Sequence, residues 1–72
     1  MMREQIKQMD GMTICFEDVS RNGDDWLVVG IGNNTYMILR NQGEHDRRFF
    51  LVGHLFTNLE EAIAKAKYFC NR

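Results

Sequence analysis

The chain has 72 residues, of which 44% are hydrophobic, and it carries a formal net charge of −1 at pH 7. This length suits one domain, residues 1–72, with a thin core, because so short a chain buries only about 60% of its unfolded surface. The near-neutral charge excludes a general attraction to nucleic acid or to an anionic membrane. No apolar run reaches transmembrane length and the first residues do not form a signal peptide, so we expect a cytoplasmic protein with reduced thiols.

Residues 1–11 are interpreted as an N-terminal arm or a short helix. Apolar residues recur there at helical spacing before Asp10-Gly11, although a helix of this length is marginal on its own. Alternating apolar and polar residues over 12–52 predict an antiparallel sheet. Its strands are expected at residues 12–19, 26–31, 35–41 and 47–52.

Two tight turns determine the expected pairing of the first three strands. Asn22-Gly23 predicts a two-residue hairpin turn, because both residues tolerate positive φ. A second two-residue turn is expected within Gly32-Asn33-Asn34. One face of the sheet then carries Ile14, Phe16, Leu27, Val29, Ile31, Tyr36 and Ile38. The opposite face carries Cys15, Val19, Trp26, Val28, Met37 and Leu39.

An amphipathic helix over residues 57–70 is the clearest element of the sequence. Thr57 is followed three residues later by Glu60, a spacing that predicts a capping box. The apolar stripe of the helix comprises Leu59, Ala62, Ile63, Ala66, Phe69 and Cys70. Because so short a helix is marginal alone, this stripe should pack on the sheet, and we assign it to the face that carries Phe16 and Val29. The predicted fold class is α+β, with two layers: a three- to four-stranded antiparallel meander and one C-terminal helix packed on one face.

The join between sheet and helix, residues 52–62, has a glycine, a phenylalanine and a Thr-x-x-Glu cap before an alanine-rich helix. It resembles the close of ethylene-response-type DNA-binding domains and that of small antitoxins with a reduced RNase-H-like fold. The similarity covers about a sixth of the chain. Gly53 and Phe56 are one residue further apart than in the DNA-binding pattern, and the strands lack that family's dense arginines and tryptophans. The resemblance therefore implies a sheet followed by a helix, and no function is transferred from it.

Residues that could catalyse a reaction or bind a metal show no recognisable pattern. Cys15, Cys70, His45 and His54 lack the spacing of a local metal site. Neither thiol has a neighbouring base in the sequence, and the acidic residues around the first turn are typical of turns. We therefore expect no catalytic, cofactor or metal site and no enzymatic activity.

The predicted sheet face opposite the helix motivates a functional hypothesis, because its apolar residues need cover. The N-terminal segment, a second copy of the chain or a protein partner could cover it, and the sequence leaves these three open. We predict a small non-enzymatic interaction module, regulatory or inhibitory, that docks on a protein partner or forms a homodimer, as accessory proteins of bacteria and phages often do. Its expected protein-binding residues are Trp26, Val28, Met37 and Leu39 on this face, with Tyr68 on the helix as an outlier.

The alternative is a nucleic-acid-binding module that uses the basic residues of the third and fourth strands. Arg40, Arg47 and Arg48 would contact phosphates, while the neighbouring phenylalanines stack on bases. No membrane partner is expected.

Overall fold

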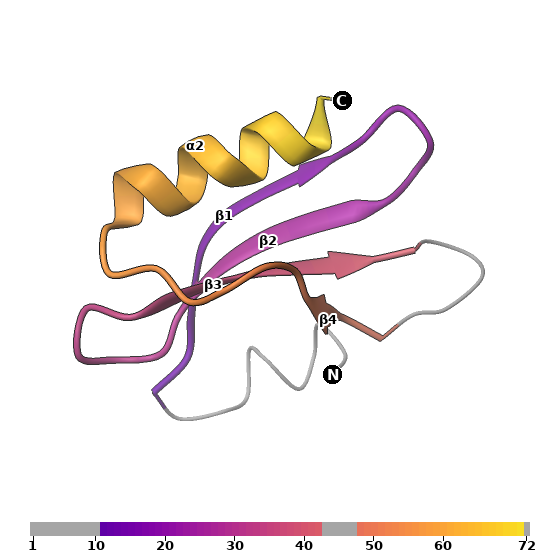
Figure 1. Cartoon of the computed structure of the whole chain (residues 1–72). Coiled ribbons are helices and arrows are strands. Elements are labelled where there is room, and N and C mark those ends of the chain that lie inside the picture. Colours follow the sequence, from indigo (N-terminus) through magenta and orange to yellow (C-terminus); the bar gives the residue numbers. More distant parts are fainter. Residues whose placement is uncertain (1–10, 43–47, 72) are drawn as a thin grey trace.

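The computed structural model describes residues 11–42 and 48–71, which form a four-stranded antiparallel sheet and one helix (Figure 1). The elements are β1 (Thr13–Val19), β2 (Asp25–Gly30), β3 (Tyr36–Asn41), β4 (Phe50–Leu51) and α2 (Leu59–Cys70). The strands lie in chain order, so β1 and β4 are the two edges of the sheet. The predicted α+β meander with one C-terminal helix is thus confirmed. The suggested N-terminal helix lies outside the described residues.

The first hairpin loop is one residue longer than predicted. The Ser20 N–H donates to the Asp24 carbonyl (2.8 Å), and the Gly23 N–H donates to the Ser20 carbonyl (3.0 Å), so residues 21–23 form the loop. Gly23 has a φ of 89°, the left-handed position that follows a type I turn in a three-residue hairpin loop. As a result Phe16 pairs with Val28, whereas the predicted two-residue turn at Asn22-Gly23 would have paired it with Val29.

The second hairpin loop also holds three residues, 32–34, rather than two. The Ile31 N–H donates to the Thr35 carbonyl (3.0 Å), and the Thr35 N–H donates to the Gly32 carbonyl (3.0 Å). Asn33 and Asn34 take φ values of 52° and 53°, which asparagine tolerates better than other residues with a side chain. This loop pairs β2 with β3 through opposed residues such as Leu27 with Leu39 and Val28 with Ile38.

The predicted composition of the two sheet faces was therefore partly wrong. Successive strand residues point to opposite faces, so one extra loop residue exchanges the faces of the strand that follows. The face under α2 carries Phe16, Trp26, Val28, Tyr36 and Ile38. The opposite face carries Met12, Ile14, Leu27, Val29, Ile31, Met37, Leu39 and Phe49. Residues two apart in a strand normally share a face, but a register shift between Ile14 and Phe16, typical of a β-bulge, places these two residues on different faces.

Both faces are buried within the chain. On the face away from α2, Leu27 and Val29 are fully buried and Leu39 is 3% exposed. Phe49 belongs to the same apolar cluster. Of the three kinds of cover that the sequence left open, this burial within a single chain favours cover by the chain itself over a second copy or a partner.

Helix α2 lies along one side of the sheet, over β1 and β2 in the view of Figure 1. Its N-cap is Asn58, whose side-chain oxygen accepts a hydrogen bond from the Glu61 N–H at 3.0 Å. The predicted cap at Thr57 was one residue too early, because Asn-x-x-Glu offers the same geometry and asparagine caps at least as well. Ala62, Ala66 and Cys70 are buried on the sheet, and their small side chains let the helix approach closely.

Strand β4 is shorter than predicted and is interrupted. It pairs with β3 through Leu39–Leu51 and Arg40–Phe50 only. The chain leaves the sheet at residues 53–55, where Gly53 has a φ of 75°. It then returns through Phe56, whose N–H and carbonyl both bond to Tyr36 at 2.8 Å. This excursion places residues 53–55 at the exposed edge of the sheet.

Candidate functional site

The five predicted protein-binding residues do not form one surface. Trp26 (6% exposed) and Val28 (fully buried) lie under α2, whereas Leu39 and the half-buried Met37 belong to the opposite face. The predicted shared face of the four sheet residues was wrong, because the loop between β2 and β3 is one residue longer than expected. Only Tyr68, at 58%, exposes most of its side chain. Their role in docking stays a prediction.

A different set of apolar side chains is exposed at the β4 edge of the sheet. Phe50, Leu51 and Leu55 expose 48%, 52% and 49% of their surface. Phe50 and Leu51 are successive strand residues and point to opposite faces of the sheet at this edge; we call the three residues the edge patch. Sequence reasoning missed the patch because the register of the fourth strand was open, and alternation alone does not distinguish its buried from its exposed residues. Val19, which is 58% exposed, lies at the end of β1 on the opposite edge.

The three arginines of the nucleic-acid alternative differ in their surroundings. The Arg40 guanidinium bonds to the Asp24 carboxylate and lies 5.5 Å from the centre of the Trp26 ring. The Arg48 guanidinium lies 5.5 Å from the centre of the Phe50 ring. Arg47 lies outside the described residues. Because Arg40 is neutralised by Asp24, it offers less charge to a phosphate than the sequence implied.

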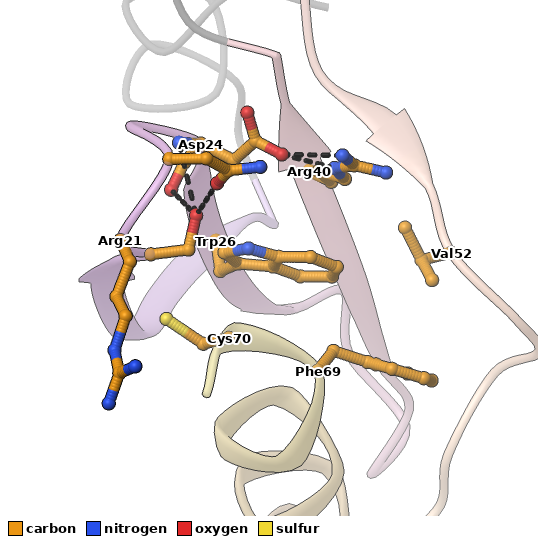
Figure 2. Close-up of a pocket in the computed structure, with 9 residues that line it drawn as sticks. Arg21, Asp24, Trp26, Arg40, Val52, Phe69 and Cys70 are labelled. Atoms are coloured by element: carbon orange, nitrogen blue, oxygen red, sulfur yellow. Dashed lines mark hydrogen bonds and ion pairs between the residues drawn. The ribbon is translucent and has the colours of Figure 1, made fainter. Parts of the chain in front are cut away.

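A pocket of about 460 Å³ lies between the loop that joins β1 to β2, strand β3 and the last turn of α2 (Figure 2). Trp26 forms its floor and stacks on Phe69, with ring centres 5.7 Å apart and planes inclined by 19°. The Arg40 Nε donates to Asp24 Oδ2 at 2.8 Å, and its Nη2 donates to the same oxygen. We call this the hairpin pocket. It is built from segments that are distant in sequence, so no sequence motif could have revealed it.

Several polar groups around the hairpin pocket are bonded to one another, but one buried donor is not. The Ser20 hydroxyl accepts from the Asp24 N–H at 3.1 Å and donates to the Asn22 side-chain oxygen. The Trp26 Nε1–H is buried and has no hydrogen-bond acceptor among the residues that the structure describes. A buried donor without a partner costs about 1–3 kcal/mol, so this atom is an unusual feature of the site.

The thiol that borders the hairpin pocket is not an activated nucleophile. Burial raises the pKa of the Cys70 thiol above its ordinary value of 9.0, and the nearby Asp18 carboxylate raises it further through its charge and a hydrogen bond. Cys70 is therefore a protonated, weakly nucleophilic thiol near neutral pH. Cys15 is exposed, and both cysteines are free. Within residues 11–42 and 48–71, no three His, Cys, Asp or Glu side chains group together to hold a metal ion.

Comparison with known proteins found no family model, no curated protein and no solved structure that matches this chain. In the part of the chain that the structure describes, no helix has the length and apolar character needed to cross a membrane.

Proposed function

We propose that this protein is a small non-enzymatic interaction module, regulatory or inhibitory, that docks on a protein partner or on a second copy of itself in the cytoplasm. The edge patch is the observation that supports this proposal. Single exposed apolar residues are ordinary on protein surfaces, whereas neighbouring ones often mark an interaction site. Phe50, Leu51 and Leu55 are each about half exposed within six residues of one sheet edge.

The edge of β4 suits recognition through side chains more than through the backbone. Only two residue pairs join β4 to β3, and the excursion at residues 53–55 breaks the edge, which limits the addition of another strand. Phe50 and the Arg48 beside it are of the residue types that are enriched in protein interfaces. An apolar partner surface would bury the patch, and an acidic group at its rim would face Arg48.

The second candidate is nucleic-acid binding through the same edge. The Arg48–Phe50 pair is the observation that favours it, because an arginine over an aromatic ring can contact a phosphate while the ring stacks on a base. The pairing of Arg40 with Asp24 weakens this candidate relative to protein docking. The two candidates differ in whether binding survives removal of nucleic acid.

The test is a pull-down from native lysate, with and without nuclease, using the wild type and two matched variants. Phe50→Ser with Leu55→Ser removes two of the three side chains of the edge patch, and Val19→Ser removes a comparably exposed apolar side chain on the opposite edge. We expect a stoichiometric protein that survives nuclease, is retained by Val19→Ser and is lost with the double variant. Light scattering of the same three proteins detects self-association, which the double variant should abolish.

Two results would contradict protein docking through the edge patch. Equal recovery by the double variant and the wild type would show that the patch is not the docking surface. Recovery that collapses with nuclease in the wild type would favour the nucleic-acid candidate. Circular dichroism of each variant checks that the fold is retained, which these exposed positions should allow.

A further inference from the structure

Beside the hairpin pocket, beneath its surface, lies a hydrogen-bond donor that has no acceptor among the described residues. Trp26 is 6% exposed, and its Nε1–H has no partner. Buried polar groups in proteins are nearly always bonded, so an orphan donor beside a pocket suggests a missing acceptor. Figure 2 shows the nitrogen-bearing edge of the Trp26 ring turned toward the loop that carries Asp24, away from α2.

Other groups around this pocket also favour an acceptor. Arg21 lines the pocket and is exposed, and it extends from the loop beside Cys70 (Figure 2). Arg40 directs its Nε and Nη2 to one oxygen of Asp24, which leaves its other N–H groups for a further partner. A guanidinium donates hydrogen bonds and never accepts them, so both arginines favour a ligand that carries a hydrogen-bond acceptor.

The balance of charge in the lining is positive. Arg21 and Arg40 contribute two positive charges, and Asp24 contributes one negative charge. Cys70 adds none, because its raised pKa keeps the thiol protonated. Asp18 is outside the lining, but it lies next to Cys70 and places a negative charge at that border of the pocket. The unbonded N–H groups of Trp26 and Arg40 therefore favour a hydrogen-bond acceptor, and the charges of the lining itself favour an anion over a cation.

The size and the apolar walls of the pocket indicate the size and shape of the ligand. Its volume of about 460 Å³ falls within the range of about 300–1,000 Å³ that is usual for small-molecule sites. The stacked rings of Trp26 and Phe69, with Val52, provide flat apolar surface. We infer that the hairpin pocket binds a small planar carboxylate, which accepts a hydrogen bond from Trp26 Nε1–H and meets the charge of Arg21 and the remaining N–H groups of Arg40. This site is separate from the edge patch and does not depend on the proposed docking function.

Binding requires a small movement of the loop. The Trp26 nitrogen is shielded from solvent, so the ligand oxygen reaches it when the exposed residues 21–23 shift outward. Loops of this kind move readily because few buried contacts hold them. The indole N–H therefore reports binding directly.

The test uses the full-length, ¹⁵N-labelled protein and benzoate as the probe. Trp26 is the only tryptophan of the chain, so its indole N–H gives a single, unambiguous NMR signal, and its fluorescence is an independent readout. We expect benzoate to shift this signal saturably, with a dissociation constant in the millimolar range or below. Benzamide has the same ring without the charge and should bind at least several-fold more weakly.

Two variants and a matched control test which residues bind benzoate. Arg21→Gln should weaken benzoate binding about threefold, the effect expected of one exposed charge pair. Trp26→Phe keeps an aromatic floor without the donor and should weaken binding about tenfold, read from the amide signals of Val52 and Phe69. Lys65→Gln also removes one positive charge, but from a part of α2 outside the lining, and should leave the affinity for benzoate unchanged.

The inference is overturned if benzoate causes no saturable shift of the indole signal. It is also overturned if benzamide binds as tightly as benzoate, or if Arg21→Gln and Lys65→Gln behave alike. Because Arg21 is exposed, its substitution should not disturb folding. The test therefore remains decisive even if Trp26→Phe fails to fold.

Discussion

At the residue scale, Cys70 shows how burial controls the chemistry of a side chain. Its thiol is buried under the last turn of α2 and lies close to the Asp18 carboxylate, and both effects raise its pKa. When the chain unfolds, the thiol returns to its ordinary value of 9.0. The folded and unfolded states therefore bind protons differently above that pH.

We predict that Cys70 makes the protein less stable as the pH rises above 9.0. The unfolded thiol loses its proton first, so the unfolded state binds fewer protons and the free energy of unfolding falls until the folded thiol also ionises. Urea denaturation below and above this pH measures the loss. Cys70→Ala should lose less stability over the same interval than the exposed Cys15→Ala control, and equal losses in the two variants would contradict this assignment.

At the element scale, the cap of α2 decides where the helix begins. Asn58 satisfies the N–H of Glu61, one of the donors that the first turn of a helix leaves without a backbone partner. Glu60 and Glu61 in the first turn, and Lys67 in the last, suit the helix dipole. The helix is short, so its stability depends on this cap and on packing against the sheet.

We predict that Asn58→Ala lowers the free energy of unfolding by about 1 kcal/mol. In a domain of this size that corresponds to a fall in Tm of about 4–8 °C, which thermal circular dichroism can measure. Thr57→Ala is the matched control, because it alters the residue that the sequence favoured as the cap. A larger loss in Thr57→Ala than in Asn58→Ala would show that the cap lies at Thr57 in solution.

At the scale of the whole molecule, the Asp24–Arg40 pair joins the first hairpin loop to the third strand across the sheet. Asp24 is 6% exposed, and its carboxylate oxygen takes two hydrogen bonds from Arg40, sixteen residues away. The total stability of a chain this short is roughly 4–11 kcal/mol. One such long-range contact therefore matters to the stability of the entire fold.

We predict that Arg40→Gln destabilises the protein by about 2 kcal/mol, because it leaves the buried Asp24 carboxylate without its cation. Arg21→Gln, which removes an exposed charge from the adjacent loop, should change stability by less than about 0.5 kcal/mol. Chemical denaturation of both variants gives the comparison. Similar values for the two would indicate that the ion pair contributes little in solution.

The candidate sites differ in how far the sequence could predict them. The sequence shows that Phe50 and Leu55 are apolar, but it does not show that they are exposed. Their exposure depends on the short pairing of β4 with β3. The hairpin pocket depends on Trp26, Arg40 and Phe69, which come from three elements. Their proximity is a property of the fold, because nothing local links them.

The sequence by itself determined the order and type of the elements, including the helix that ends at Cys70 and the hairpins near Gly23 and Asn33. These features follow from local periodicity and turn preference, which neighbouring residues establish among themselves. Only the tertiary structure decided that each hairpin loop has three residues, and hence that Trp26 is buried under α2. Loops of two and three residues are close in local energy, and the packing of side chains on both faces of the sheet selects between them. Because the side-chain period of a strand is two, that selection assigns every side chain of the strand to one face or the other.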